Sequence, residues 1–352
     1  MFPRWENSYT ILLTSVSAEQ LGDHRERQLI LLRNSKLIEK RDVPCNLCGS
    51  TDHSLLLTAR DRLYGCDGTF TYVKCKECGL VYMNHQVSPD DIGKLYPPTY
   101  APHQQKSERR QQNLRLLKAK LKKRPFPASI CNKLTKQSRL LDVGCGNAEF
   151  LNEVRNVTQC QVYGIDISRA AAEAAKANYS IDMFTGTILE SPLPDGYFDV
   201  ITSWWYLEHV PNPSEVLRKM ASLLKQNGHC VIGIPNIDSF NARTFGNKWY
   251  HLDCPRHLHV YSPDTIAKLL DKTGFDVRNI FFHKAPWGLF HSIRLRFGND
   301  EVPLKDRKRL MCSSLLKRIL LPWTILLALL KKADIIVVHA RRKEACSDND
   351  QA

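Results

Sequence analysis

No apolar segment of this sequence is long enough to cross a lipid bilayer. The most apolar run, over residues 319–330, has 12 residues, whereas a spanning helix needs about 20. The N-terminus lacks the basic region and the long apolar core of a signal peptide, so we expect no secretion. No internal repeat is present either, and the 43% of hydrophobic and 24% of charged residues are typical of a globular protein.

The cysteines do not follow the pattern of a secreted protein that disulfides hold together. Four of the 12 cysteines form two Cys-x-x-Cys pairs, Cys45 with Cys48 and Cys75 with Cys78, and a glycine follows each pair. Such a glycine lets the chain turn so that backbone amides point at sulfur, and four thiolates satisfy Zn²⁺ in a closed tetrahedral site. We therefore predict a structural zinc ribbon over residues 43–84 in a cytoplasmic protein; unrelated free thiols are the alternative.

Acidic residues are outnumbered, because 50 lysines and arginines stand against 36 aspartates and glutamates, for a net charge of +14. This excess favours an anionic partner: a nucleic acid, a phosphorylated substrate or an anionic membrane surface. Leucines at near-helical spacing among the basic residues of 111–123 predict a basic amphipathic helix. The apolar run over 319–330 has basic residues on both sides and predicts a segment lying on the inner face of the membrane; a buried cap or a dimer interface is the alternative.

From Ser138 onward, short apolar strands alternate with helices. The predicted strands cover residues 139–143, 161–165, 181–184, 198–204, 229–234, 275–282 and 334–340. The predicted helices cover residues 148–155, 169–178 and 213–225, and a fourth starts at Ser262, a capping residue before Pro263, and ends at Gly274. Strands separated by helices indicate a parallel sheet that is covered on both faces.

The first strand runs into an Asp-x-Gly-x-Gly motif at residues 142–146. A strand, a tight turn and a helix N-terminus in this order bring the backbone close to a charged small molecule. A dinucleotide-binding loop fits less well, because Glu149 stands where that motif needs a third small residue. Asp166 follows the second strand, where an acid can accept hydrogen bonds from both hydroxyls of a ribose; an acid that caps the next helix is the alternative.

This order of residues resembles the Asp-x-Gly-x-Gly signature of class I S-adenosylmethionine (SAM)-dependent methyltransferases. The resemblance implies a Rossmann-like α/β fold with a seven-stranded sheet, its last strand antiparallel, and SAM as the cofactor. It places the cofactor contacts in the glycine loop, after the next two strands and on the fourth strand, at Asp142, Gly144, Cys145, Gly146, Asp166, Ile167, Thr187, Ile188 and Trp204. Cys145 and Thr187 are expected to contribute backbone amides, and Trp204 either a ring face for the sulfonium or a packing contact in the core.

Glu208 and His209 follow the fourth strand and resemble the Glu-His step of ubiquinone-pathway O-methyltransferases. His209 is a candidate general base, with Glu208 and His257 as further catalytic candidates. A structural hydrogen bond is the alternative role for His209, because methyl transfer depends mainly on alignment.

Residues 255–262, Pro-Arg-His-Leu-His-Val-Tyr-Ser, resemble a signature of zinc-ribbon methyltransferases that serve saccharide and lipid-linked glycan pathways. Ligands gather at the carboxyl ends of parallel strands, so we expect the acceptor to be bound by Tyr206, Asn236, Arg256 and His259. The Arg256 guanidinium would hold a phosphate or a carboxylate. We expect no metal ion at the histidines of 251–259, because no carboxylate lies at helical ligand spacing from them.

The sequence thus predicts methyl transfer from SAM to an oxygen, or else a nitrogen or carbon, of a small metabolite that is phosphorylated or linked to a sugar or lipid. A nucleic-acid methyltransferase is one alternative, although Ile-Pro-Asn-Ile at 234–237 replaces the Asn-Pro-Pro-Tyr type of motif. An inactive SAM-binding module is the other. The predicted units are a leader (1–42), the zinc ribbon (43–84), a linker with the basic helix (85–134), the SAM-binding core (135–285), an insertion (286–332), the last strand (333–343) and a tail (344–352).

Overall fold

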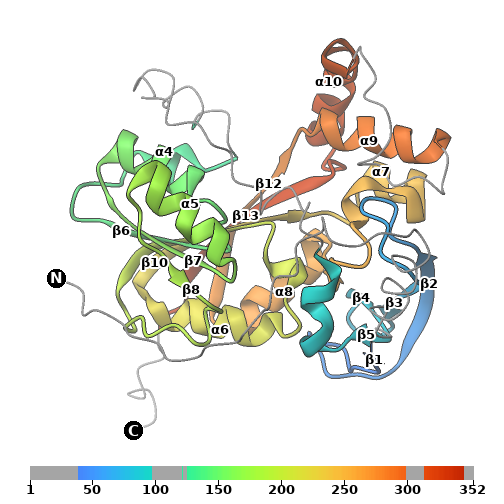
Figure 1. Cartoon of the computed structure of the whole chain (residues 1–352), viewed down its shortest axis with the longest axis horizontal. Helices are drawn as coiled ribbons and strands as arrows, with labels where there is room; N and C mark the ends of the chain where they lie inside the picture. Colours follow the sequence, from blue (N-terminus) through green and yellow to red (C-terminus); the bar gives the residue numbers. More distant parts are fainter. Residues whose placement is uncertain (1–38, 97–120, 122–124, 299–312, 345–352) are drawn as a thin grey trace, which may run out of the picture. The chain divides into compact units, whose positions relative to one another are not determined.

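The computed structural model describes residues 39–96, 121, 125–298 and 313–344 (Figure 1). The predicted basic helix over 111–123 lies outside these residues except for Leu121. Most of the predicted leader and of the predicted tail also lies outside them. Contacts divide the chain after Glu39, and the described elements belong to the second unit, Lys40–Ala352.

A seven-stranded sheet forms the centre of this unit. Its strands, in chain order, are β6 (Arg139–Val143), β7 (Gln161–Asp166), β8 (Phe184–Thr185), β9 (Phe198–Trp204), β10 (Leu224–Pro235), β12 (Phe275–His283) and β13 (Ile335–Arg342). Their spatial order is β12-β13-β10-β9-β6-β7-β8. Neighbours are parallel except for β13, which runs antiparallel to both β10 and β12. The predicted fold class, a Rossmann-like α/β sheet whose last strand is antiparallel, is confirmed.

Helices cover both faces of the sheet (Figure 1). They are α4 (Glu149–Thr158) and α5 (Arg169–Tyr179) on one face, and α6 (Pro213–Leu223) and α8 (Pro263–Lys272) on the other. Successive residues of a strand point to opposite faces. Leu140 of β6 accordingly packs with α4, whereas Leu141 packs with α6. Strands that are apolar on both sides therefore require a helical layer on each side.

The start of β10 differs from the prediction. The sequence predicts a helix through residue 225 and a strand from 229, whereas α6 ends at Leu223 and β10 begins at Leu224. Leu224 has an extended backbone (φ −73°, ψ 143°) and pairs with Phe198 of β9. Its side chain is fully buried, so packing in the core overrides the helical pattern of the local sequence.

The N-terminal segment forms a ribbon. Its elements are β1 (Lys40–Arg41), β2 (His53–Ala59), β3 (Phe70–Cys75), β4 (Val81–Met83), β5 (Gln86–Val87) and the 3-10 helix η1 (Pro89–Leu95). The distant strand β11 (His259–Val260) pairs with β4 and completes a four-stranded sheet, β11-β4-β3-β2. Leu47, Val73 and Leu80 of the ribbon share one buried core with Leu217 of α6. The ribbon, predicted as a unit of its own over 43–84, is thus packed into the same core as the large sheet.

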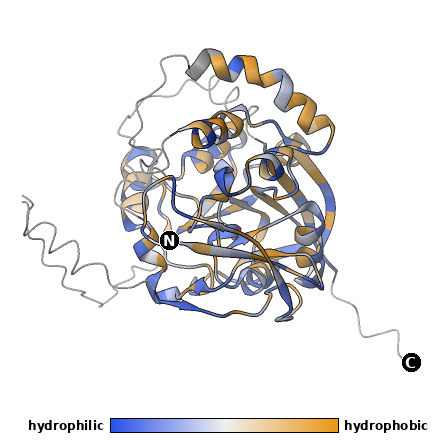
Figure 2. Ribbon diagram, turned by 90° about the vertical axis from the view of Figure 1, so that its right-hand side faces the viewer, coloured by the Kyte–Doolittle hydropathy of each residue, from blue (hydrophilic) through white to orange (hydrophobic). Residues whose placement is uncertain are grey.

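The other helical segments are α3 (Ala128–Cys131), η3 (Leu207–His209), α7 (Phe240–Phe245), η4 (Gly246–Lys248), η5 (Tyr250–Leu252), α9 (Pro286–Phe297) and α10 (Ser313–Leu329). The helix α10 contains most of the apolar run over 319–330 (Figure 2). Ile319, Trp323, Leu326 and Leu329 are between 41% and 75% exposed, whereas Leu327 is buried. None of the described helices is both long enough and apolar enough to span a membrane.

Candidate active site

The turn after β6 is held to the neighbouring strand by its backbone. The amides of Gly144 and Cys145 both donate to the carbonyl oxygen of Ile165, at 2.9 and 3.0 Å. Gly144 and Gly146 have φ angles of +73° and +52°, a region that favours glycine. A Cβ atom at Gly144 would lie 2.6 Å from Cδ2 of Tyr206. Position 144 therefore requires glycine for two reasons, the backbone conformation and the close approach of the Tyr206 ring.

Two carboxylates lie at the carboxyl ends of β6 and β7. Oδ2 of Asp166 accepts a hydrogen bond from the amide of Gly146 at 2.8 Å, and Oδ1 accepts one from the amide of Ser168 at 2.9 Å. Ser168 itself caps α5, so the cap does not need Asp166. Each carboxylate oxygen can accept more than one hydrogen bond, which leaves Asp166 able to receive ribose hydroxyls. Asp142 is buried and accepts a hydrogen bond from the Thr202 hydroxyl at 2.6 Å.

The structure corrects several of the predicted cofactor contacts. The Cys145 amide, expected to face the cofactor, donates to Ile165 instead, and its thiol is buried. The amide and the hydroxyl of Thr187 both donate to Oε2 of Glu190 at 2.8 Å. Ile188 is fully buried in the core, whereas Ile167 is 59% exposed beside Asp166. Neither predicted backbone amide is thus directed to a ligand.

The aromatic residues after β9 divide between the core and the loop. The Trp204 ring packs edge-to-face on Phe150, with ring centroids 5.5 Å apart, and fills the space beside Gly233. Of the two roles predicted for Trp204, the structure therefore favours the packing contact in the core. Tyr206, predicted to contact the acceptor, lies over Gly144 on the cofactor loop. Burial, followed by the Asp166 carboxylate, raises the pKa of the Tyr206 phenol above its ordinary value, so the phenol is neutral.

The three predicted catalytic residues come together. Glu208, His209 and His257 each place one side-chain nitrogen or oxygen within 4.8 Å of the others. The two imidazole rings are nearly perpendicular, with centroids 4.6 Å apart. Burial raises the pKa of Glu208 to about 8. Burial, followed by the neighbouring His209, lowers the pKa of His257 well below its ordinary value and keeps that ring neutral.

Sequence reasoning missed two neighbours of this cluster. The Tyr96 hydroxyl lies 3.0 Å from Nδ1 of His209, and Oδ2 of Asp253 lies 3.8 Å from Nε2 of His257. Asp253 stands four residues before His257 in the sequence, so a carboxylate does lie at helical spacing from one of the histidines of 251–259, contrary to the premise of the prediction that no metal ion binds there. Tyr96 belongs to no motif, so only the fold brings it to His209.

Arg256, predicted to hold a phosphate or a carboxylate of the acceptor, is engaged by the protein itself. Its guanidinium is buried and donates to both carboxylate oxygens of Asp61, at 2.8 and 2.9 Å. It also donates to Oδ1 of Asp253 through Nε and Nη2, and to the carbonyl of Leu95. All three guanidinium nitrogens are thus engaged by the protein. Although burial alone lowers it, the pKa of Arg256 is raised by Asp253 and Asp61, so the charge is permanent.

Asn236 and His259, predicted to bind the acceptor, also have structural positions. Asn236 is fully buried, and its side chain donates to the carbonyl of Ala333 and accepts from the amide of Asp238. His259 lies in β11, buried opposite Tyr82 of β4. Burial lowers the pKa of His259 to about 4. Both side chains are thus buried, and that of Asn236 is engaged by the protein itself.

Further aromatic rings lie next to the cluster. Trp205 stacks on His251 with ring centroids 5.4 Å apart and planes 12° apart. Trp287 of α9 meets His251 edge-to-face at 4.7 Å. Burial lowers the pKa of His251 to about 3, so its ring is a neutral partner for the two indoles. The rings of Trp205 and Trp287 form an apolar wall around His251, whose carbonyl oxygen lies 2.9 Å from Nδ1 of His257.

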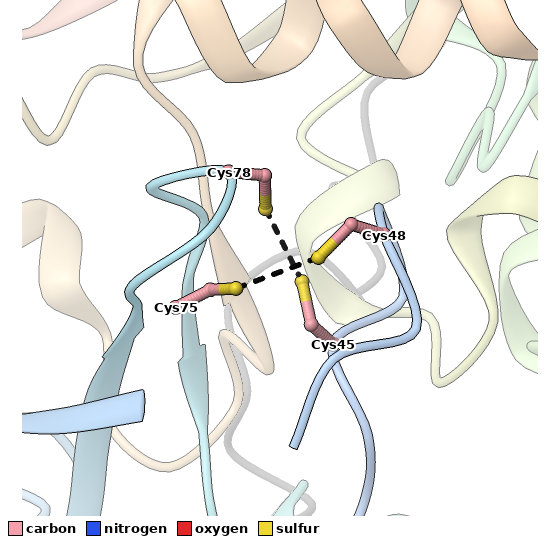
Figure 3. Close-up of side chains that lie close together, drawn as sticks. All are labelled: Cys45, Cys48, Cys75 and Cys78. Atoms are coloured by element: carbon pink, nitrogen blue, oxygen red, sulfur yellow. Dashed lines mark hydrogen bonds between the residues drawn. The ribbon is translucent and has the colours of Figure 1, made fainter. Parts of the chain in front are cut away.

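The four ribbon cysteines converge as predicted (Figure 3). Sγ of Cys45 lies 3.4 Å from Sγ of Cys78, and Sγ of Cys48 lies 3.5 Å from Sγ of Cys75. Two matching turns present them, because the glycine after each pair has a φ near +82° and donates to the first cysteine of its pair. Four converging sulfur atoms fit the ligand set of a closed tetrahedral zinc site.

The order of the strands, the glycine loop and the acid at the end of the next strand define a class I methyltransferase domain. Residues 106–280 match the family described as a methyltransferase domain. This part of the chain is a SAM-dependent methyltransferase domain.

Two curated relatives share the name ubiquinone biosynthesis O-methyltransferase. The chain is 32% identical to the protein of Marinobacter nauticus over 156 residues, which cover 40% of this chain and 65% of that protein. It is 33% identical to the protein of Ralstonia nicotianae over 133 residues, covering 35% and 55% respectively. The chain thus spans less than two thirds of either relative. Among solved structures, a SAM-dependent methyltransferase from Archaeoglobus fulgidus has a TM-score of 0.43 and 22% identity, covering 66% of this chain and 96% of that chain.

Proposed function

We propose that this protein transfers a methyl group from SAM to an oxygen atom of a small metabolite. One juxtaposition carries the proposal: Tyr206 lies over Gly144 of the cofactor loop, and the cluster of Glu208, His209 and His257 begins two residues later. Cofactor and acceptor would therefore meet at the carboxyl ends of β6, β7 and β9, as ligands do in open parallel sheets. SAM, when bound, supplies an electrophilic methyl group on a sulfonium.

The residues of the loop have separate roles in this proposal. Asp166, fixed by the amides of Gly146 and Ser168, accepts hydrogen bonds from the ribose hydroxyls. Asp142 attracts the ammonium group of the cofactor. Gly146 leaves room for the methionyl chain, because it carries no side chain, and Gly144 lets the Tyr206 ring lie against the loop.

On the acceptor side, an imidazole is available to take a proton from a hydroxyl. His209 is the candidate base, and its ring is held by Tyr96 and by the carbonyl of Arg256 at 3.0 and 3.1 Å. The apolar wall of Trp205 and Trp287 excludes water and orients an apolar part of the acceptor. Orientation is the larger contribution, since methyl transfer depends on aligned approach.

The proposed class of acceptor rests on the names of the relatives, on the net charge and on the segment over 255–262. Both relatives are named as O-methyltransferases, which favours oxygen over nitrogen or carbon. The net charge of +14 favours a phosphorylated acceptor, and the segment over 255–262 favours one linked to a sugar or lipid. Because Arg256 is engaged by Asp61 and Asp253, another basic group must hold any phosphate. An RNA acceptor is the second candidate, on account of the same charge.

The helix α10 would bring the protein to the cytoplasmic membrane surface. Its exposed Trp323, Leu326 and Leu329 form an apolar face, and Arg318 and Lys331 are exposed near its two ends. Apolar faces with basic flanks bind anionic lipid surfaces. A lipid-linked acceptor would then be presented at the surface where the enzyme lies.

The four cysteines would hold a structural zinc ion. A closed four-thiolate site contributes folding energy directly, here to a ribbon whose Leu47, Val73 and Leu80 belong to the core of the large sheet. Since β11 joins the ribbon sheet and leads back to His257, the zinc would also fix one side of the acceptor site.

A methylation assay on whole metabolite extract tests the proposed function. The full chain is incubated with radiolabelled SAM and extract, and the products are separated into lipid, glycan and RNA fractions. We expect label in the lipid or glycan fraction, and none with the Asp166→Ala variant. Label in the RNA fraction alone would show that the acceptor is RNA and not a metabolite linked to a sugar or lipid. Absence of labelled product from all three fractions would contradict methyl transfer.

A further inference from the structure

Potential metal ligands meet beside the cofactor loop. Glu208 and His209 belong to η3, which follows β9, whereas His257 comes from the loop before β11. The amide of Leu258 donates to the carbonyl of Glu208 at 2.8 Å and fixes the two segments side by side. One ligand atom of each of the three residues then lies within 4.8 Å of the other two.

The carboxylate of Glu208 is buried without a counter-charge among the described residues. Its side chain is fully buried, and neither oxygen has a hydrogen-bond partner in that part of the chain. Nε2 of His257 lies 3.9 Å from Oε1, which is too far for a hydrogen bond. The nearby guanidinium of Arg256 donates to Asp61 and Asp253 instead. Because an unpaired charge in the interior is costly, this position requires a cation or a proton.

The two imidazoles have the orientation of metal ligands. Nδ1 of His257 lies 2.9 Å from the carbonyl oxygen of His251, which can only accept, so the hydrogen is on Nδ1 and the lone pair on Nε2. Nδ1 of His209 lies 3.1 Å from the carbonyl oxygen of Arg256, which can only accept, and 3.0 Å from the Tyr96 hydroxyl, which can accept or donate. The carbonyl contact favours the same tautomer. Histidines that bind metal almost always donate their other ring N–H to a carbonyl or carboxylate.

We propose that Glu208, His209 and His257 bind one divalent transition-metal cation, such as Mn²⁺, Fe²⁺ or Zn²⁺. Two imidazoles and one carboxylate form a facial set that leaves coordination positions open. Mg²⁺ and Ca²⁺ prefer oxygen ligands alone. The prediction that no metal ion is bound concerned only the histidines of 251–259. The carboxylate and the second imidazole come from η3, and only the fold brings them to His257.

The role of this cation rests on the proposed function. Glu208 lies two residues after Tyr206, whose ring lies over Gly144 of the cofactor loop, so a cation held by the three residues would lie on the acceptor side of that loop. With Nε2 on the cation, His209 would be a ligand and not the base. The cation would instead bind an oxygen of the acceptor and lower the pKa of its hydroxyl, and the proton would be released to solvent. An acceptor with two adjacent oxygens, or with a phosphate oxygen beside the hydroxyl, would occupy two positions at once.

Manganese titration of the full chain tests the site. The protein is prepared with zinc in the ribbon, and free Mn²⁺ is measured by its electron paramagnetic resonance signal. We expect one saturable Mn²⁺ site per chain, and about tenfold weaker binding or more in Glu208→Gln and in His257→Asn. His229→Asn is the matched control, because His229 also lies against another histidine but pairs with Val200 near the amino end of β9, whereas Glu208 and His209 follow its carboxyl end. This variant should bind Mn²⁺ as the wild type does.

The titration of the wild-type protein tests the metal site even if a variant fails to fold. No saturable binding of Mn²⁺ or of Co²⁺ beyond the ribbon would overturn it, as would unchanged affinity in folded Glu208→Gln. Calorimetric titration of the same preparations with S-adenosylhomocysteine separates the two proposals. Binding of Mn²⁺ without binding of S-adenosylhomocysteine would contradict the methyltransferase function and support the metal site. Binding of S-adenosylhomocysteine without binding of Mn²⁺ would support the function and contradict the metal site.

Discussion

Arg256 and Asp61, which are 195 residues apart in the sequence, form a doubly hydrogen-bonded ion pair with N–O distances of 2.8 and 2.9 Å. Both side chains are fully buried. The pair joins the ribbon to the loop that carries His257. Asp61 also accepts hydrogen bonds from the amides of Leu63 and Tyr64, so one carboxylate orders its own loop and neutralises the arginine.

Asp61→Asn is therefore expected to lower the free energy of unfolding by about 3–5 kcal/mol, because it leaves a buried guanidinium without one of its counter-charges. Urea denaturation measures the change. Asp52→Asn is the control, since the Asp52–Lys76 pair is more than half exposed on both sides, and should cost less than about 1 kcal/mol. Equal, small losses in both variants would show that the buried pair does not hold the ribbon in place.

Zinc in the ribbon has a consequence for the whole unit. Cys75→Ser should lose one zinc ion per chain, as measured by elemental analysis, and should lower the melting temperature of the entire fold. The reason is that Cys75 and Val73 lie in the same buried core as Leu217. Cys66→Ser, outside the cysteine cluster, should keep the zinc and the melting temperature. A full zinc content in Cys75→Ser would contradict the four-thiolate site.

The histidine pair across β10 and β13 makes stability depend on pH. Nδ1 of His229 lies 3.0 Å from Nε2 of His339. Burial, followed by His229, lowers the pKa of His339 to about 4, whereas its ordinary value is 6.5. Between these values the folded chain binds fewer protons than the unfolded chain. Its stability is thus retained above pH 6.5 and falls as the pH falls towards 4, by at most about 1.4 kcal/mol per unit.

Denaturation between pH 4 and pH 7 checks this dependence. His339→Gln should reduce the slope without removing it, because one of the buried histidines with a lowered pKa is gone while His251, His257 and His259 remain. His85→Gln, at an exposed ion pair with Asp42, should leave the slope as it is. A wild-type stability that rises as the pH falls from 6.5 to 4 would contradict the assigned direction.

Liposome binding tests the role of α10. The double variant Leu326→Glu and Leu329→Glu should lose binding to vesicles with anionic lipids, since both side chains are exposed on its apolar face. Leu55→Glu is the control, because Leu55 is 67% exposed on the ribbon strand β2. Unchanged binding by the folded double variant would remove the membrane contact and leave α10 as an interface with another protein or another copy of the chain.

The sequence predicts the large sheet better than the site, for a physical reason. β6 and β9 occupy the predicted residues 139–143 and 198–204, because a strand that is apolar on both faces is a local signal. The partners of Arg256 and of His209 are Asp61 and Tyr96, which lie 195 and 113 residues away. Hydrogen bonds over such separations leave no periodic pattern. For that reason the expected ligand of Arg256, a substrate phosphate or carboxylate, proved to be the protein itself.

Calorimetric titration with S-adenosylhomocysteine tests the central claim most directly. The wild type should bind one molecule per chain. Gly144→Ala should bind about tenfold more weakly or worse, because a Cβ there would meet the Tyr206 ring at 2.6 Å and because alanine is strained in a left-handed conformation by about 1–2 kcal/mol. Gly196→Ala has the same strain, with a φ of +63°, but no neighbour within 4 Å, and should bind as the wild type does. Absence of binding by the folded wild type would contradict the SAM site and with it the account of this protein as a methyltransferase.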